Sequence, residues 1–164
     1  MILYPRLYCK KVTDITIEFL KENNIKGIIL DVDNTLIDFD RNLLDGVVEW
    51  KNKIKETGID FIILSNSNKK EKLTNVANAL GISYIGLATK PLKRGFKKAQ
   101  EKLNLPSENI AVVGDQIFTD VLGANRCKMV SVLVMPIAEK DYLITKIKRP
   151  LENFVIKKYL KKKG

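Results

Sequence analysis

The sequence predicts an α/β fold, in which a parallel sheet lies between two layers of helices. The first observation behind this prediction is that short apolar runs alternate along the chain with segments of helical periodicity. The second is that several of these runs are apolar at consecutive positions, which is typical of strands covered on both faces. The 164 residues are enough for a single domain with its own core.

The predicted strands share a short apolar run bounded by polar residues or glycine. In chain order they are 26–30, 61–64, 84–85, 110–113 and 130–134. Residues 1–7 are interpreted as a lead-in, because they contain Pro5 and show no alternation of apolar and polar residues. Strands separated by helices pair in parallel through right-handed crossovers, so the carboxyl ends of these strands should share one edge of the sheet.

The predicted helices share apolar residues three and four positions apart. In chain order they are 14–23, 43–54, 70–80, 91–103 and 121–127. Thr13 is placed to cap the first helix, and Pro91 is suited to the first position of the fourth. Gly58 and Gly81 lie where the second and third helices should end.

The composition excludes several classes of active site. The chain has no histidine, which excludes Ser-His-Asp triads, phosphohistidine chemistry and zinc held by histidine. Neither Cys9 nor Cys127 is followed six positions later by the arginine of a thiolate phosphatase loop. The two cysteines form no disulfide framework, so we expect a protein of the reducing cytoplasm. Acid–base chemistry must then come from carboxylates, lysine or tyrosine.

Polar side chains follow three of the buried strands. Asp31 and Asp33 follow the first, Ser65 follows the second, and Asp115 and Asp120 follow the fourth. Open α/β sheets bind their ligands at this edge. Carboxylates so close repel unless a cation lies between them, and Mg²⁺ prefers oxygen ligands. The alternative for the first pair is an acidic helix cap or turn after a strand.

A lysine, Lys90, precedes a predicted helix at the same edge. Carboxylates, a hydroxyl, an ammonium group and Mg²⁺ are together the groups that are needed to transfer a phosphoryl group to an aspartate. Lys93 and Lys97 are interpreted as solvated charges on the following helix. Because the set comes from segments far apart in the sequence, the prediction depends on the parallel sheet.

Four short motifs in chain order resemble those of the haloacid dehalogenase (HAD) superfamily of phosphatases. They are Asp-Val-Asp-Asn-Thr-Leu at 31–36, Ser65, Lys90, and Gly-Asp followed by a second aspartate at 114–120. The resemblance covers about residues 26–135, and finer details are similar to the YqeG-like branch of subfamily IIIA. That branch is similar to eukaryotic phosphatidylglycerophosphate phosphatases. The resemblance implies a three-layer, Rossmann-like (HAD-like) sheet.

The resemblance also implies a role for each residue of the first motif. Asp31 would be the nucleophile that becomes an aspartyl phosphate, and also a Mg²⁺ ligand. Asp33 would act as general acid and then as general base, and would offer its backbone carbonyl to the metal. Thr35 would brace the turn that carries both aspartates.

The remaining motifs would bind the phosphoryl group and the metal. By resemblance, Ser65 would bond a phosphoryl oxygen, and Lys90 would offset the charge shared by the phosphate and Asp31. Asp115 would bind Mg²⁺, and Asp120 would assist directly, or through water or Lys90. The alternative is that Asp120 has no role in the site and only caps the start of the next helix.

The intervals between the motifs leave no room for a cap domain of the kind that encloses small substrates. Residues 36–60 can hold a loop and one helix, and residues 66–89 can hold one helix and a short strand. We therefore expect a capless protein with an open site. An open site suits a phosphate carried by a large molecule, such as a lipid at a membrane, a protein or a nucleic-acid end.

The net charge of +10 is concentrated at the C-terminal end, where nine Lys or Arg from residue 139 onward outnumber three acids. The sequence predicts a basic amphipathic helix over about 151–163, with Leu151, Phe154 and Val155 on one side. Such a helix can lie on an anionic membrane, which would make the protein peripheral there. The alternative is a helix packed on the sheet with a solubilising lysine end. No segment is long and apolar enough for a signal peptide or a membrane span.

The leading hypothesis is a Mg²⁺-dependent phosphomonoesterase with a large substrate such as phosphatidylglycerophosphate. A phosphatase for proteins or nucleic-acid ends is an alternative, as is a non-catalytic HAD-like binding module. Nucleic acid is disfavoured because there is one tryptophan and no recognised binding module. All four motifs end by Asp120, so we expect hydrolysis of a soluble aryl phosphate not to need the residues after Arg149.

Overall fold

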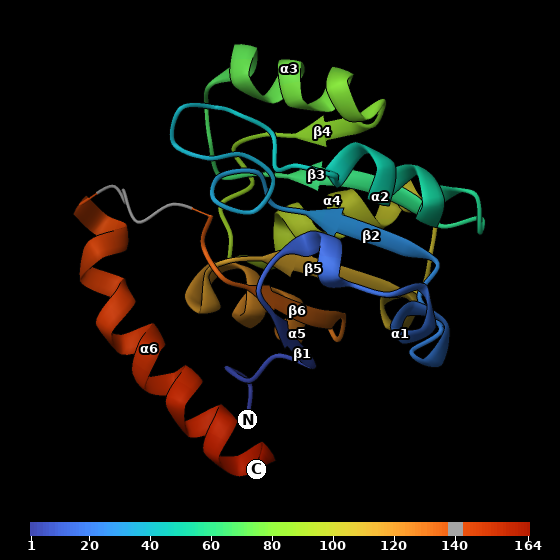
Figure 1. Cartoon of the computed structure of the whole chain (residues 1–164). Helices are drawn as coiled ribbons and strands as arrows, with labels where there is room; N and C mark the ends of the chain where they lie inside the picture. Colours follow the sequence, from blue (N-terminus) through green and yellow to red (C-terminus); the bar gives the residue numbers. More distant parts are fainter. Residues whose placement is uncertain (138–142) are drawn as a thin grey trace.

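A six-stranded parallel sheet forms the centre of the molecule, in the strand order β1-β6-β5-β2-β3-β4 (Figure 1). The computed structural model describes residues 1–137 and 143–164. Residues 138–142, which open the basic C-terminal segment, lie outside the described residues. The strands are β1 (Leu7–Cys9), β2 (Gly27–Leu30), β3 (Asp60–Leu64), β4 (Ser83–Ile85), β5 (Ile110–Gly114) and β6 (Val130–Val134).

Helices cover both faces of this sheet, as the uninterrupted apolar strands predict. In β2, Ile28 and Leu30 point to one hydrophobic core, and Ile29 points to the other. The helical elements are η1 (Val12–Asp14), α1 (Ile17–Glu22), α2 (Val47–Lys55), α3 (Lys70–Leu80), α4 (Lys93–Leu103), η2 (Ser107–Asn109), η3 (Ile117–Val121), α5 (Leu122–Arg126) and α6 (Leu143–Lys163). Residues of α2 and α3 pack in the first core, and residues of α4 and α5 pack in the second.

The predicted α/β class and parallel sheet are confirmed, and each of the five predicted strands is present. The lead-in prediction was wrong at its end, because Leu7–Cys9 forms β1 and pairs in parallel with β6. This edge strand has only three residues, all of them half-buried. Its apolar run is short, and a short run is a weak signal for a strand.

Several helices begin later than predicted, because the residues that were expected to open them form turns or loops instead. Thr16, rather than Thr13, caps α1 by accepting a hydrogen bond from the Phe19 backbone N–H. Residues 43 and 44 belong to a loop, in which Leu43 forms an isolated bridge with Ile37, so α2 begins at Val47. Helix α4 begins at Lys93 rather than at Pro91.

The intervals between the motifs contain short connections. After β2, residues 31–46 form a loop with two isolated bridges, and α2 follows at once. Between β3 and α4, the described chain forms only α3 and β4 with their connecting turns. Neither interval holds a separate cap, so the carboxyl edge of the sheet stays uncovered by one, in agreement with the expected open site.

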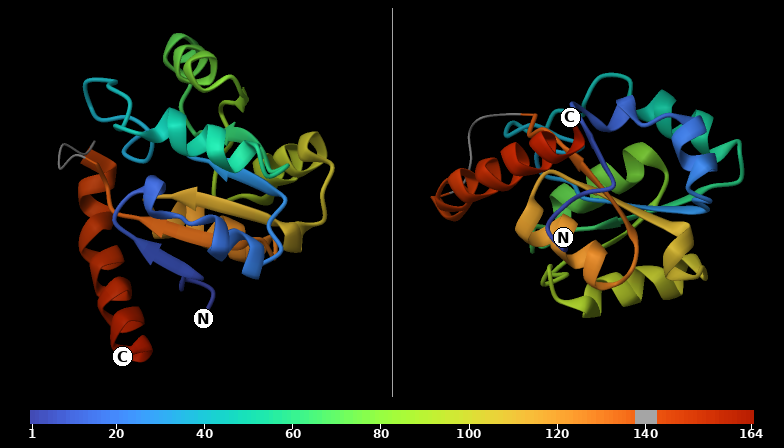
Figure 2. Two further views of the ribbon diagram at one scale, coloured as in Figure 1. Left: turned by 45° about the vertical axis from the view of Figure 1, so that its right-hand side comes forward. Right: turned by 90° about the horizontal axis from the view of Figure 1, so that it is seen from below.

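Helix α6 lies along the edge of the molecule near β1 and β6, with its C-terminal end near the N-terminus of the chain (Figures 1 and 2). It is longer than the predicted helix over 151–163, and Pro150 lies inside it. Proline lacks one backbone N–H, and the ion pair between Arg149 and Glu152 spans this position. Val155 packs in a third core cluster with Ile117 and Leu133, so one side of the helix is part of the core.

Candidate active site

The candidate site lies where the order of the strands reverses along the chain. Strand β2 pairs with β3 on one side and with β5 on the other, and the chain adds β3 and β4 before it returns to β5. Leu30 and Val113 are paired in register, so Asp31 and Asp115 leave the sheet close together. This is the topological switch point at which open α/β sheets bind ligands.

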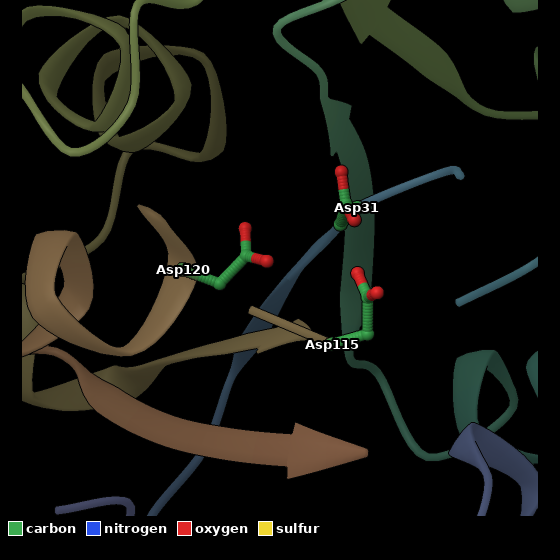
Figure 3. Close-up of side chains that lie close together, drawn as sticks. All are labelled: Asp31, Asp115 and Asp120. Carbon is green, nitrogen blue, oxygen red and sulfur yellow. The ribbon is translucent and has the colours of Figure 1, made fainter. Parts of the chain in front are cut away.

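Asp120 reaches the same point from the single π-helical turn η3 (Figure 3). The turn folds back on the end of β5, and its aspartate lies directly against Gly114. A Cβ atom at Gly114 would overlap the Asp120 carboxylate, so only glycine fits there. The spacing from Gly114 to Asp120 therefore brings two carboxylates of one segment to the same site. Figure 3 shows the carboxylates of Asp31, Asp115 and Asp120 around a common space.

Lys90 joins two of these carboxylates. Its ammonium nitrogen lies 2.9 Å from Asp31 Oδ1 and 2.7 Å from Asp120 Oδ1, and the lysine is buried. Asn66 fixes the lysine backbone: its Oδ1 accepts from the Lys90 N–H at 2.7 Å, and its Nδ2 donates to the Lys90 carbonyl at 3.2 Å. Asn66 therefore holds the backbone of Lys90 at both its N–H and its carbonyl.

Burial and the neighbouring charges shift the pKa values of the residues in this cluster. Burial and the nearby charges of Asp31 and Asp120 raise the pKa of Asp115 well above its usual range, although Arg149 opposes the shift. Burial also raises the pKa of Asp120 to about 6, against the opposing charge of Lys90. For Lys90, burial alone would lower the pKa, but the carboxylates of Asp120 and Asp31 outweigh it and raise the pKa. The negative charge of the cluster is thus only partly compensated.

The donor set fits a hard divalent cation. One carboxylate oxygen each from Asp31, Asp115 and Asp120 lies within 4.8 Å of the others. Burial is the main cause of the two raised pKa values, and repulsion between the carboxylates adds to it. An added cation would favour the ionised carboxylates, and oxygen ligands suit Mg²⁺. Thr35 braces this arrangement, because its hydroxyl lies 3.4 Å from Asp31 Oδ2 and 3.4 Å from Asp115 Oδ1.

Asp33 lies beside the cluster and not within it. Its carboxylate, which is 42% exposed, accepts two bonds from the Lys72 ammonium at 2.8 and 2.9 Å. Among the described residues, the carboxylate group that can hold a metal does not include Asp33. Its carboxylate is therefore placed at the rim, where it can exchange protons with a leaving group or water.

Ser65 lines the same hollow as Asp31, Asp33 and Lys90, in a cavity of about 90 Å³. The serine is buried, and its hydroxyl accepts a bond from the Ser67 backbone N–H at 3.1 Å. The hollow leaves room for a phosphoryl group beside Asp31. Because the carboxylate of Asp33, which also lines it, is 42% exposed, the rest of a substrate can extend outside.

Arg149 of α6 was not predicted to be near the site. Its guanidinium bonds the Asp115 carboxylate at 2.6 Å and the Glu152 carboxylate at 3.1 Å. The expectation that soluble-substrate hydrolysis does not need the residues after Arg149 therefore loses its basis, because Glu152 is one of them. The sequence left two interpretations of the tail, a helix on an anionic membrane or a helix packed on the sheet with a solubilising lysine end. Nothing in the four motifs points to Arg149 or Glu152.

The geometry agrees with comparisons to known proteins. The profile of the haloacid dehalogenase-like hydrolase family matches residues 39–128. The probable phosphatase YqeG of Bacillus subtilis (strain 168) is 41% identical over 161 residues, which cover 98% of this chain and 92% of that protein. The chain belongs to the haloacid dehalogenase-like hydrolase family. This HAD protein is an enzyme of the hydrolase class, as its motifs imply, and its curated relative is named as a phosphatase.

A more distant relative is a phosphatase named for a lipid substrate. The HAD protein is 25% identical over 169 residues to phosphatidylglycerophosphate phosphatase 1, chloroplastic/mitochondrial, of Arabidopsis thaliana. The match covers 96% of this chain and 48% of the plant protein, so the chain spans about half of that relative. Among solved structures, p-nitrophenyl phosphatase from Archaeoglobus fulgidus has a TM-score of 0.53 at 19% identity, covering 76% of this chain and 92% of that one. At that identity the likeness supports the HAD fold alone.

Proposed function

We propose that this protein is a Mg²⁺-dependent phosphomonoesterase that forms an aspartyl phosphate on Asp31. The observation that carries the proposal is the convergence of three carboxylates and Lys90 at the switch point of the sheet. Mg²⁺, held by Asp31, Asp115 and Asp120, would supply positive charge against the phosphate oxygens. Residues far apart in the sequence are thus arranged as transfer of a phosphoryl group to a carboxylate requires.

The reaction proceeds in two displacements at phosphorus. A carboxylate oxygen of Asp31 attacks, the bond from phosphorus to the leaving oxygen breaks, and Asp33 donates a proton to that oxygen. Asp33 then takes a proton from water, the water oxygen attacks phosphorus, and the bond to Asp31 breaks to release inorganic phosphate. Lys90 and Ser65 hold the transferring group, since both line the cavity with Asp31.

We further propose that the substrate is a phosphate monoester on a lipid head group, such as phosphatidylglycerophosphate. The cavity of about 90 Å³ is small and no cap covers it, so the rest of a large substrate can lie outside it. The plant relative is named for this lipid. Among the described residues, no helix is long and apolar enough to cross a membrane. The protein would then be cytoplasmic and reach the lipid from the membrane surface.

Exposed apolar side chains support such a surface contact. Four of them follow strands at the carboxyl edge of the sheet, where the site opens: Phe39, Leu87, Leu92 and Met135. Helix α6 adds Leu151 and Phe154, which are 61% and 57% exposed on the side away from the core. Lys158 lies 4.8 Å from the centre of the Phe154 ring, and Lys157 and Lys161–Lys163 are exposed nearby. Apolar contact together with lysine attraction is how a peripheral helix binds anionic lipid. In this proposal, residues 1–164 form a single phosphatase domain, in which α6 and the carboxyl edge of the sheet contact the membrane together.

A panel of phosphorylated substrates tests the function, with phosphatidylglycerophosphate in mixed micelles, a phosphopeptide, a nucleic acid with a terminal phosphate and an aryl phosphate. Each is assayed with Mg²⁺ and with excess EDTA. We expect the lipid to be hydrolysed fastest, the aryl phosphate slowly because nothing encloses it, and none in EDTA. Full activity in EDTA contradicts the metal assignment, and preference for the peptide or nucleic acid contradicts the lipid assignment.

A further inference from the structure

We propose that Arg149 is a positioning residue, which holds Asp115 so that one carboxylate oxygen faces the metal position. Through this arginine, the C-terminal helix α6 is part of the active site. The inference rests on the proposed function, because it concerns how the carboxylate cluster binds its cation. It concerns a residue outside the four motifs, on a segment whose sequence resembles a solvated basic tail.

Arg149 donates hydrogen bonds to Asp115 at two points, the carboxylate and the backbone carbonyl. Its NH2 nitrogen lies 2.6 Å from Asp115 Oδ2, and its NH1 nitrogen donates to the Asp115 backbone carbonyl at 2.8 Å. The Asp115 side chain has no exposed surface, and that of Arg149 is 16% exposed. Contacts to both the backbone and the carboxylate fix the position and the rotation of the aspartate. The planar fork of a guanidinium suits such a two-point contact, whereas an ammonium group is a point charge.

The two carboxylate oxygens of Asp115 have different surroundings. Oδ2 bonds Arg149, whereas Oδ1 is turned toward the Thr35 hydroxyl, 3.4 Å away. The same hydroxyl lies 3.4 Å from Asp31 Oδ2. Arg149 thus leaves Oδ1 on the side of the cluster where the other carboxylates meet. Partners that fix one oxygen of a ligating carboxylate orient the other toward the metal.

Arg149 is itself held in place by its own helix. Glu152, one turn further on, is 1% exposed, and its Oε2 accepts from Arg149 NH1 at 3.1 Å. Its other oxygen accepts from the Phe118 backbone N–H of η3 at 3.4 Å, in the same turn that carries Asp120. Val155 follows on the same side of α6 and packs on Ile117. The helix is therefore anchored to η3 at the point where the arginine reaches the site.

The same geometry defines two opposing roles for the arginine. As a competing cation, Arg149 would weaken Mg²⁺ binding, and its removal would strengthen it. As a positioning group it strengthens binding, and an ammonium would replace it poorly. The contact on Oδ2, away from Thr35 and Asp31, favours the positioning role, since a competitor would lie among the three carboxylates.

The test is calorimetric titration of Mg²⁺ into metal-free protein, for wild type, Arg149→Met and Arg149→Lys. Arg126→Met, which changes an exposed arginine at the end of α5, is the matched control. We expect both Arg149 variants to raise the Kd for Mg²⁺ about 10–100-fold, as losses of such outer partners do. The control should bind as wild type does. An unchanged or lower Kd in Arg149→Met overturns the proposal, and so does full recovery in Arg149→Lys, which would leave charge alone as the cause.

A second variant covers the case in which Arg149→Met does not fold, judged by the Tm of the metal-free protein. Glu152→Gln retains an oxygen for Phe118 but loses the charge that holds Arg149, so we expect a smaller rise in Kd. Wild-type Kd values in both Arg149→Lys and Glu152→Gln overturn the proposal. If wild type binds Mg²⁺ but does not hydrolyse the lipid, only the substrate assignment fails. If wild type binds no Mg²⁺, the metal-dependent function fails, and this inference with it.

Discussion

Lys72 donates to both carboxylate oxygens of Asp33, at 2.8 and 2.9 Å. Asp33 lines the same cavity as Asp31, Ser65 and Lys90. Lys72 is 5% exposed, although the other lysine of α3, Lys70, is in solvent. Its aliphatic stem lies among the apolar residues on the buried side of α3, and its ammonium faces the site. The proposed proton donor is thus held by a residue that belongs to none of the four motifs.

We expect Lys72→Met to lower kcat about tenfold, which is less than the loss of a general acid, about 10²–10⁴-fold. Methionine keeps the buried stem but cannot hold Asp33, so the carboxyl group is less often aligned with the leaving oxygen. Mg²⁺ affinity should change little, because Asp33 lies outside the carboxylate cluster. Steady-state kinetics with an aryl phosphate measure this, with the exposed Lys70→Met as control. Wild-type kcat in Lys72→Met contradicts a positioning role for Lys72.

Asp31→Asn should lose turnover by several orders of magnitude while it keeps the fold, since the amide matches the carboxylate in shape but is a poor nucleophile. Asp33→Asn should also be severely impaired, yet it can still accept phosphate on Asp31, because the attacking group is intact. Mass spectrometry of acid-quenched protein would detect the trapped phosphate. Substantial activity in Asp31→Asn, with deamidation excluded, would mean that another residue attacks phosphorus.

The metal-free protein should become more stable as the pH falls from 7 to 5. Asp115 and Asp120 have pKa values above the unfolded-state value, Asp120 at about 6, so the folded state binds more protons in this window. We expect Tm in EDTA to rise by a few degrees, and Asp120→Asn to reduce that rise. Mg²⁺, which needs the ionised forms, should stabilise more at pH 7 than at pH 5. A Tm that falls equally in both proteins contradicts the assignment.

The parallel sheet and the positions of the four motifs after its strands followed from the sequence, because each depends on a local signal. An apolar run such as 61–64 can be buried on both faces only in a covered parallel sheet. The polar residues after the runs, such as Asp31 and Asp115, must then meet at one edge. Prediction succeeded where a short segment and the rule for parallel sheets together determined the position.

Lys72, Arg149 and Glu152 could not be predicted in the same way, because each acts through a long-range contact. Lys72 lies next to Leu73 on the buried side of α3. A position beside an apolar residue is only a weak indication that a lysine is buried. Glu152 is the single acid of α6 among many lysines, and such an acid more often lies in solvent. Only the packing of α6 on η3 brings Arg149 to Asp115. The π-helical turn over 117–121 was also missed, because it has no distinct sequence pattern.

Helix α6 has two sides with different chemistry. Glu152, Val155 and Tyr159 are buried against the rest of the protein, whereas Leu151 and Phe154 are exposed. Truncation after Arg149 would remove both sides and so would test packing together with membrane contact. Substitutions confined to the outer side separate the two, because they leave Arg149 and its partners in place.

The double variant Leu151→Ser, Phe154→Ser should sediment less with anionic vesicles than wild type does, since serine removes the apolar contact and leaves lysine attraction alone. Tm and aryl phosphate hydrolysis should be unchanged, because both side chains are exposed. Ile2→Ser, which changes a 50% exposed apolar residue outside both α6 and the carboxyl edge of the sheet, is the matched control. Raising the salt concentration should release wild type from the vesicles, because the lysine contribution is screened over about 10 Å at 0.1 M. Equal sedimentation of the double variant and wild type would place any lipid contact elsewhere, with the exposed residues at the carboxyl edge, Phe39 and Leu87 among them, as the next to substitute.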